Sequence, residues 1–196
     1  QDARELSGFV AKASRQATTA IAGFDLSFSP VKSVSALWAL APRPVAAQIR
    51  AAHDAAVAHT LSWLEREAAY TRVGRAGSRQ VKVRGLVAAA FTHRDSRSGD
   101  PDLHTHVAVS NKVQTEDGRW LALDGRILYA AKVAASEHYN TRIEAELVDR
   151  LGVEFAERDP ATHGKRPVRE IRGISTTLTR FWSRRSADIK ARQSEL

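Results

Sequence analysis

The chain has 196 residues, no cysteine or methionine, 43% hydrophobic residues and a net charge of +8 with a pI of about 10.3. This length and apolar content indicate one globular domain with a sizeable core. The lack of cysteine excludes disulfides and thiolate metal sites, so any metal ion must be bound through His, Asp or Glu. No run of about 18 apolar residues occurs, so we expect no contact with a membrane.

Basic residues outnumber acidic ones by 30 to 22, and most of them are arginine. A surface of this charge attracts polyanions, and guanidinium groups contact phosphates in pairs and stack on bases. The composition therefore favours nucleic acid as a partner. A GC-rich genome would also enrich Ala and Arg, so charge alone does not decide the function.

Hydropathy patterns predict the elements in chain order. Residues 1–22 are polar and Ala-rich and form an N-terminal segment, and residues 23–196 form the main domain. Clean alternation over residues 24–29 predicts a half-buried strand with Asp25 on its polar face. Apolar stripes and proline positions predict helices over residues 33–40 and 44–70.

Residues 71–80 contain two glycines and three arginines and are predicted to form a mobile, basic loop or hairpin tip. The later elements are strands over 80–84, 86–92, 103–114, 120–123 and 153–157 and helices over 124–151 and 175–192. Hairpins mixed with long helices, rather than repeated βαβ units, indicate an α+β fold with an antiparallel sheet covered by helices on one face.

The segment from residue 91 to residue 109 carries His93, His104 and His106. Side chains of a strand alternate between its faces, so His104 and His106 point the same way, opposite an apolar row that begins at Leu103. The turn signal Gly99-Asp100-Pro101 predicts a hairpin that brings His93 back beside them. Three converging imidazoles can hold a divalent ion with open positions for a substrate oxygen.

The His-x-His pattern also occurs outside metal sites of this kind, and in other families. By itself the pattern is more often a pair of half-exposed polar side chains than a metal site. A cupin would need a Glu soon after the pair, where Ser110 to Val113 stand, and a histidine-triad hydrolase would need a third histidine in place of Ala108. Neither family fits.

Two carboxylates accompany the histidines. Asp25 faces their side if its strand lies next to theirs, where it could orient an imidazole or accept a proton. Asp102 precedes His104 by two residues, so it is either a partner or fourth ligand of the ion or a solvated turn residue.

Two segments, GFDLSFSPVKSVSALWAL at residues 23–40 and FTHRDSRSGDPDLHTHVAVSN at 91–111, resemble the MobF-type (TrwC/TraI-like) conjugative relaxases of the HUH endonuclease superfamily. The resemblance continues through DGRWLALDGR and covers about residues 22–195. It implies a five-stranded antiparallel palm sheet covered by helices. It also implies a divalent ion (Mg, Mn or Zn) bound by the residues matching His93, His104 and His106, which polarises the scissile phosphate. The residue matching Asp25 orients a histidine or activates the nucleophile.

The resemblance further implies the partners. The substrate is single-stranded DNA at a plasmid transfer origin, other relaxosome proteins are candidate partners, and the location is the bacterial cytoplasm. The sequence leaves the oligomeric state open, and a monomer is the default expectation. Arginines in or beside the expected DNA-facing loops are candidate DNA contacts, although each is equally consistent with a solvated basic surface. They are Arg72, Arg75, Arg79, Arg84, Arg94 and Arg97.

The nucleophile of this family is a tyrosine upstream of the first palm strand. The tyrosines of this chain, Tyr70, Tyr129 and Tyr139, all follow Asp25, so none matches, and the chain is expected to bind DNA without nicking it. Two alternatives remain open. One is a sequence-specific DNA-binding module that cuts nothing, and the other is an HUH replication initiator that would use Tyr139.

Overall fold

Residues 20–158 and 167–194 are described in the computed structural model. The elements in chain order are β1 (Gly23–Phe28), α2 (Lys32–Leu40), α3 (Arg43–Glu67), β2 (Tyr70–Val73), η1 (Arg75–Gly77), β3 (Arg79–Lys82), β4 (Ala88–Asp95), β5 (Pro101–Ser110), β6 (Val113–Gln114), β7 (Trp120–Leu121), α4 (Gly125–Ala130), α5 (Lys132–Leu151), β8 (Phe155–Glu157), β9 (Arg169–Ile171), α6 (Thr176–Phe181) and α7 (Arg184–Ser194).

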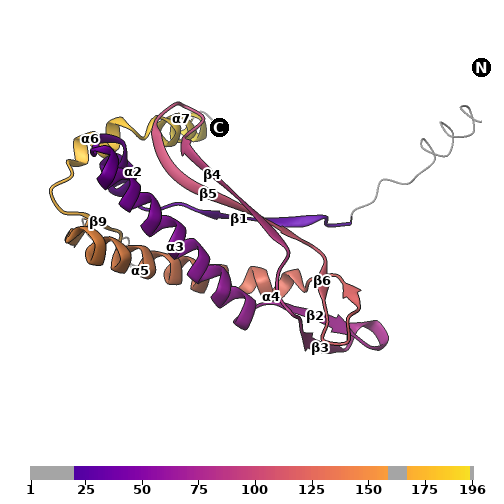
Figure 1. Ribbon diagram of the computed structural model, residues 1–196. Helices are drawn as coiled ribbons and strands as arrows, with labels where there is room; N and C mark the ends of the chain where they lie inside the picture. Colours follow the sequence, from indigo (N-terminus) through magenta and orange to yellow (C-terminus); the bar gives the residue numbers. More distant parts are fainter. Residues whose placement is uncertain (1–19, 159–166, 195–196) are drawn as a thin grey trace, which may run out of the picture.

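The main sheet is antiparallel, with strand order β1–β5–β4 (Figure 1). The central strand β5 alternates strictly, because Leu103, Thr105, Val107 and Val109 are buried while the residues between them are partly or fully exposed. A strand with this pattern buries one face and leaves the other to solvent. The predicted strand at residues 24–29 and the predicted two-faced character of the histidine strand are confirmed.

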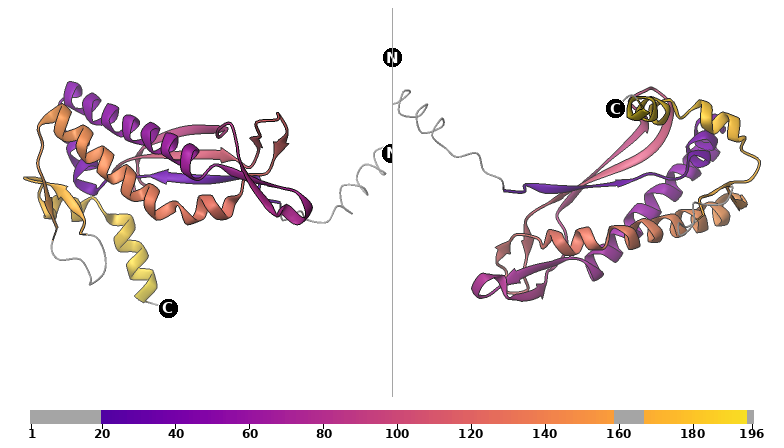
Figure 2. Two further views of the ribbon diagram at one scale, coloured as in Figure 1. Left: turned by 90° about the horizontal axis from the view of Figure 1, so that it is seen from below. Right: turned by 180° about the vertical axis from the view of Figure 1, so that it is seen from behind.

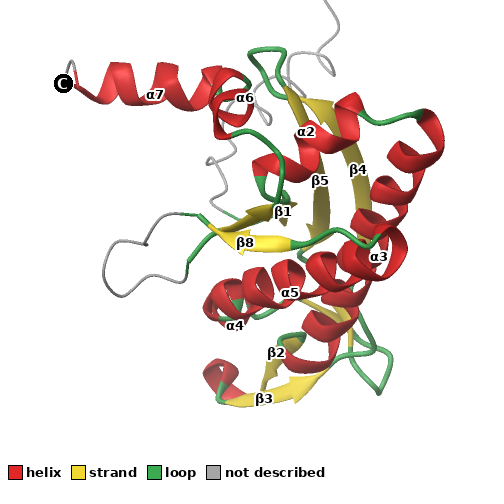
Figure 3. Ribbon diagram, turned by 90° about the vertical axis from the view of Figure 1, so that its left-hand side faces the viewer, coloured by secondary structure: helices red, strands yellow, loops and turns green. Residues whose placement is uncertain are grey.

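Helices cover the apolar face of this sheet. Helix α2 packs on β5, and the long helices α3 and α5 pack side by side, as Figures 1 and 3 show. The core lies between the two layers and includes Phe28, Ile49, Leu64 and Leu147, each no more than 6% exposed. The predicted α+β architecture, with helices on one face of an antiparallel sheet, is therefore confirmed.

The expected five-stranded palm sheet is wrong for the described residues, where the main sheet has three strands. The other strands pair among themselves in two-stranded ribbons, β2 with β3, β6 with β7 and β8 with β9. Each ribbon joins near neighbours in sequence. The isolated bridges Thr71–Leu123 and Val83–Thr115 link the β2–β3 region to the region of β6 and β7 rather than to the main sheet.

The basic segment at residues 71–80 is a hairpin, the second of the two forms that the sequence predicted. Strand β2 pairs in register with β3, from Tyr70 opposite Lys82 to Val73 opposite Arg79. The connecting turn uses Gly74 and Gly77, both with positive φ, which glycine adopts without steric cost. The hairpin begins at Tyr70, so α3 ends at Glu67, earlier than the apolar stripe predicted.

Two predicted helices are each divided in two. The helix expected over residues 124–151 breaks at Ala131 into α4 and α5, and the last helix breaks at Trp182–Ser183 into α6 and α7. Neither break has a glycine or proline to mark it. Strand β9 was missed because its three residues, Arg169 to Ile171, are too few and too charged to show a period. Most of the predicted N-terminal segment 1–22 lies outside the described residues.

The described helices include none that is long and apolar enough to span a lipid bilayer. The most apolar surfaces of α3 and α5 are instead used in the core, where Ile49, Leu64, Ile143 and Leu147 are nearly inaccessible.

The burial of one ionisable core side chain, that of His53, predicts how the stability of the fold depends on pH. His53 of α3 is fully buried, and this burial lowers its pKa from 6.5 to about 4. The folded state therefore favours the neutral ring, so the contribution is complete above pH 6.5 and is lost as pH falls from 6.5 to 4. We expect the free energy of unfolding to fall by roughly 3 kcal/mol over this window because of His53.

Denaturant unfolding of the chain and of His53→Gln at several pH values measures this effect. Glutamine cannot titrate, so the difference in unfolding free energy between the two proteins should shrink steadily from pH 6.5 to pH 4. A constant difference over that range would show that His53 does not carry this pH dependence.

Candidate functional site

The three histidines named by the sequence come together on the exposed face of the main sheet. His93 of β4 pairs directly with His104 of β5, and His106 follows on the same face. The ring centroids are 5.2 Å apart for His93–His104, 5.4 Å for His93–His106 and 5.2 Å for His104–His106. The predicted hairpin thus places three imidazoles, here called the histidine cluster, within one small area.

The turn that creates this arrangement is held at both ends. Gly99 has a φ of 73°, a conformation that favours glycine, and the N–H of Ser96 donates to the carbonyl of Asp100 at 2.8 Å. The buried carboxylate of Asp100 accepts from the backbone N–H of Arg184 at 2.8 Å and from its Nε at 2.7 Å. Helix α7 is thereby anchored to the hairpin that carries the cluster.

Asp25 of β1 contacts the cluster from the neighbouring strand. The Nδ1 of His106 lies 2.8 Å from Oδ2 and 3.0 Å from Oδ1 of Asp25, as expected for an N–H donating to a carboxylate. A hydrogen bond of this kind fixes the tautomer, so the lone pair of His106 lies on Nε2.

His104 is oriented by its own strand. Its Nδ1 donates to the backbone carbonyl of Asp102 at 2.8 Å, and the Asp102 carboxylate lies 3.6 Å from the same nitrogen. Lys32 of α2 donates to the carbonyl of Pro101 at 2.6 Å and lies 3.8 Å from the Asp102 carboxylate. In this arrangement Asp102 lies beside the Nδ1 edge of His104. That position suits a partner of the histidine better than a fourth ligand.

The donor chemistry of the cluster suits a divalent ion. Two of the three rings have Nδ1 engaged by an acceptor, which leaves Nε2 as the nitrogen that could bind an ion, and imidazole nitrogen suits Zn, Cu, Fe or Ni. As they stand, no three His, Asp or Glu side chains within residues 20–158 and 167–194 form a ready-made ion site. The cluster is therefore a set of neighbouring imidazoles rather than a completed coordination sphere.

The candidate DNA-binding arginines fall into two groups. Arg72, Arg75 and Arg79 belong to the β2–β3 hairpin, and Arg84 follows it. Figure 1 shows this hairpin at the far end of the β4–β5 ribbon from the Gly99 turn, and Figure 2 shows it projecting from the body of the molecule. Arg94 lies at a register irregularity next to His93, and Arg97 lies in the turn. The structure therefore does not gather all six arginines around the histidines.

Arg72 is partly committed to the fold. Its Nε donates to the nearly buried carboxylate of Asp124 at 2.7 Å, and Arg84 donates to the carbonyl of Glu116 at 3.0 Å. Burial alone would raise the pKa of Asp124, but the hydrogen bonds from Arg72 and from the Arg126 N–H lower it below its ordinary value. Arg75 and Arg79 are exposed, which leaves them the freest of this group to contact phosphate.

The tyrosines lie away from the cluster. Tyr139 is 3% exposed beneath the sheet, and burial raises the pKa of its hydroxyl, so it is not available as a nucleophile. Tyr70 belongs to the distant β2–β3 hairpin. Tyr129 is exposed, and a hydrogen bond from Lys132 lowers its pKa, but it lies across β1 from the histidines.

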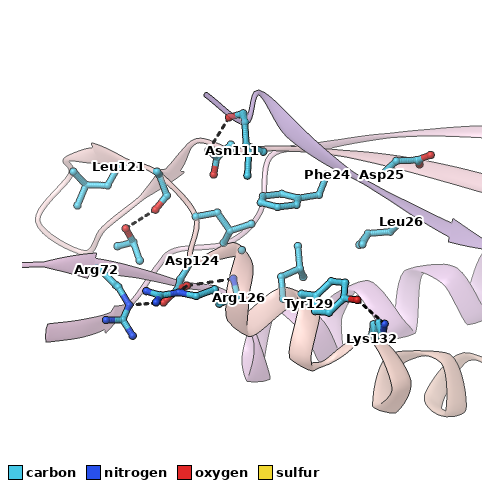
Figure 4. A pocket seen from close by; sticks show the side chains of 16 residues that line it. Phe24, Asp25, Leu26, Arg72, Asn111, Leu121, Asp124, Arg126, Tyr129 and Lys132 are labelled. Atoms are coloured by element: carbon cyan, nitrogen blue, oxygen red, sulfur yellow. Dashed lines mark hydrogen bonds and ion pairs between the residues drawn. The ribbon is translucent and has the colours of Figure 1, made fainter. Parts of the chain in front are cut away.

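A cavity of about 960 Å³ lies on that side of β1, lined by apolar residues such as Phe24, Leu26 and Leu128 and bordered by Arg126 and Lys132. Figure 4 shows Tyr129 on the side of Phe24 and Leu26, with the Asp25 carboxylate turned away from them. Asp25 borders the cavity but bonds to His106 on the other face. None of the three histidines lines this cavity.

Two residues near the cluster, one on its own face and one beneath the sheet, were not among the sequence candidates. Phe91 pairs with His106 across the strands, so it shares the face of the histidines, and it is 55% exposed. Its alternation with His93 was a usable signal, and an exposed ring there can stack on a base. His53, on the opposite face, was hidden in a helical pattern that reads only as core.

Comparison with known proteins gives consistent results. The family model described as TrwC relaxase matches residues 3–196. The multifunctional conjugation protein TraI of Escherichia coli K12 is 34% identical over 142 residues, covering 67% of this chain and 8% of TraI. A second Escherichia coli TraI is 34% identical over 158 residues, covering 78% and 9%. The chain thus spans less than a tenth of these relatives.

Solved structures are similar as well. The metal-bound conjugative relaxase TrwC in complex with oriT DNA has a TM-score of 0.78 at 34% identity, covering 93% of this chain and 60% of that one. A copper-bound TrwC complex with oriT DNA has a TM-score of 0.77 at 35% identity, covering 91% and 58%. The family model spans nearly the whole chain and the relatives exceed 30% identity, so this chain belongs to the TrwC relaxase family, the MobF-type relaxases of conjugation.

Proposed function

We propose that this chain is the sheet-and-helix portion of a relaxase domain that binds single-stranded DNA at a plasmid transfer origin and positions one phosphodiester for transesterification by tyrosine. The observation that carries the proposal is the histidine cluster, in which three imidazoles from two strands lie within 5.4 Å of one another beside Asp25. The DNA-bound TrwC structures support this choice of substrate.

In this proposal His93, His104 and His106 hold a divalent ion, with Mg, Mn or Zn as candidates. The ion would supply positive charge next to the non-bridging oxygens of the phosphate, which lowers the barrier to attack. Three neutral ligands leave the full charge of the ion available. The metal-bound and copper-bound TrwC complexes support a divalent ion without fixing which metal serves here.

The protein groups have separate roles. The carboxylate of Asp25 holds the His106 ring by its Nδ1–H and would accept a proton from an attacking hydroxyl on this face. The exposed ring of Phe91 offers a stacking surface to a base next to the bound phosphate. Arg75 and Arg79 offer phosphate contacts further along the strand.

The proposed partners differ in how much evidence supports each of them. Single-stranded DNA is the proposed partner, other relaxosome proteins are secondary candidates, and we propose a monomer acting in the bacterial cytoplasm.

The binding of DNA is tested by its salt dependence. We expect the affinity for a fluorescent single-stranded oligonucleotide to fall linearly on a logarithmic scale, with a slope of roughly −2 to −5 at about −0.7 per phosphate contact. Anisotropy titrations at several salt concentrations give this slope. Replacing Arg72, Arg75 and Arg79 together with Ala should make it shallower.

Two further variants sharpen this test. The pair Arg75→Ala with Arg79→Ala leaves the Arg72–Asp124 contact intact, so it separates DNA contact from damage to the fold. The charge-matched control is Arg50→Ala with Arg150→Ala, which removes two arginines that pair with Asp54 and Glu146 on the helices. A slope that is flat in the parent chain would contradict DNA binding, and equal slopes in the two double variants would remove the hairpin from the DNA surface.

A further inference from the structure

A set of linked buried hydrogen bonds, here called the buried network, lies beneath the histidine cluster, on the opposite face of the same two strands. The hydroxyl of Tyr139 lies 2.7 Å from Nδ1 of His53, and Nε2 of His53 lies 2.7 Å from Oγ1 of Thr105. The Thr105 hydroxyl lies 2.9 Å from that of Thr92. His53, Thr105 and Tyr139 are at most 3% exposed.

The buried network meets β4 and β5 at the same level as the histidines. Thr105 stands between His104 and His106 on β5, and Thr92 precedes His93 on β4. Thr92 and Thr105 pair directly, and the next pair along the ribbon is His93 with His104. The buried contacts therefore meet the two strands at the level of the imidazoles and connect them to α3 through His53 and to α5 through Tyr139.

The residue types on the inward face of β5 indicate that the hydroxyl of Thr105 has a role other than stabilising the core. The inward residues of β5 on either side of Thr105 are Leu103, Val107 and Val109, all buried and apolar. A valine at position 105 would fill the same space without a hydroxyl to satisfy. Buried polar groups are costly unless every member is bonded, but when satisfied they select one arrangement of the core.

Only one placement of the hydrogens satisfies every donor and acceptor of the buried network. Within the described residues the Tyr139 hydroxyl has only His53 as a hydrogen-bond partner, so it donates to Nδ1, and the Nε2–H of His53 then donates to Thr105. This requires a neutral ring, and burial lowers the pKa of His53 to about 4. The threonine contact also distinguishes strand registers, because a two-residue slip keeps every side chain on its face but separates Thr92 from Thr105.

We propose that His53, Thr105 and Tyr139 are positioning residues that fix the backbone of β5 between His104 and His106 and so set the spacing of the three imidazoles. None of them touches the substrate or the ion. The metal part of the idea rests on the proposed function, whereas the effect on imidazole geometry does not. Ligand distances tolerate errors of only about 0.2 Å, so a small shift of this backbone weakens an ion site.

The test uses the intact 196-residue chain and variants of nearly equal volume. Thr105→Val removes the hydroxyl, Thr105→Ser keeps it, and Tyr139→Phe removes the hydrogen bond to His53 at the other end of the buried network. Val109→Ala lies on the same inward row, outside the hydrogen bonds, and serves as a control for general loss of stability. Circular dichroism and thermal melting first establish a temperature at which each protein is folded.

Two readouts are then compared. In titrations with Mn²⁺, Thr105→Val should weaken binding by about 10- to 100-fold, while Thr105→Ser and Val109→Ala stay within about threefold of the parent. In the metal-free protein, the imidazole NMR signals of His93, His104 and His106 should shift or broaden in Thr105→Val and Tyr139→Phe but recover in Thr105→Ser.

The outcomes separate the two ideas. If the parent chain binds no Mn²⁺, the proposed metal site fails and the imidazole signals alone decide the positioning role. Unchanged imidazole signals in both Thr105→Val and Tyr139→Phe would overturn the positioning role. Losses in Val109→Ala equal to those in Thr105→Val would also overturn it, because they would trace the effect to stability alone.

Discussion

Replacing His104 with Ala should abolish the tight binding of one divalent ion per chain. The ring centroid of His104 lies 5.2 Å from that of His93 and 5.2 Å from that of His106, and the three rings form a nearly equilateral triangle. Loss of His104 removes one of the three proposed nitrogen ligands. The expected weakening exceeds the roughly 100-fold upper range seen when a residue that merely supports a ligand is changed.

Isothermal calorimetry with Mn²⁺ and Zn²⁺ measures this effect, and His93→Ala and His106→Ala should behave in the same way. His59→Ala is a matched control, because His59 also has an exposed ring, stacked on His138 on the helical side of the molecule. Binding that survives in all three cluster variants would remove the proposed site. Loss of binding in His59→Ala would place the ion elsewhere.

The histidine cluster was predictable because it depends on local rules. Two-residue alternation put His104 and His106 on one face, and the Gly99 turn returned the chain so that His93 met His104. The neighbourhood of Asp25 was predictable only conditionally. The sequence assigned Asp25 to the polar face of its strand, but the pairing of β1 with β5 is a long-range choice that no local pattern specifies.

Long-range pairing also explains what the sequence did not reveal. The separation of β2–β3, β6–β7 and β8–β9 from the main sheet depends on which strand edges meet, and strand patterns do not encode this. His53 lies in a helix whose apolar stripe reads as ordinary core, and its contacts with Thr105 and Tyr139 join residues 52 and 86 positions away. A polar residue within an apolar stripe was the only local sign of it.

The two faces of β5 divide the work of the site. Residues that would meet the substrate point to solvent, and the residues that hold them point to the helices. A strand can do both because its side chains alternate, so each imidazole has a buried neighbour one residue away. This is why the variants with the largest expected effects lie on the exposed face, while those with intermediate effects lie beneath it.

The 196-residue chain should bind transfer-origin DNA in the presence of Mn²⁺ without forming a covalent adduct. Tyr139 is buried under the sheet, Tyr129 lies on the side of β1 from which the Asp25 carboxylate is turned away, and Tyr70 lies in the β2–β3 hairpin. Attack on phosphorus needs a hydroxyl held in line with the leaving oxygen. Water substitutes poorly for a tethered group, whose effective concentration can reach about 10⁵ M or more.

Labelled oligonucleotides spanning the cognate transfer origin, incubated with the chain and run on a denaturing gel, provide the measurement. Adding upstream of residue 1 the tyrosine-bearing segment of a TrwC-type relaxase should produce an adduct that survives denaturation. In that extended protein Asp25→Ala should slow adduct formation by about 10- to 10⁴-fold, because His106 loses its anchor and the hydroxyl loses its proposed proton acceptor. Asp54→Ala, a carboxylate on α3 that pairs with Arg50, should leave the rate unchanged. An adduct formed by the 196-residue chain and mapped to Tyr70, Tyr129 or Tyr139 would instead favour a nucleophile that follows the histidines, as in a replication initiator.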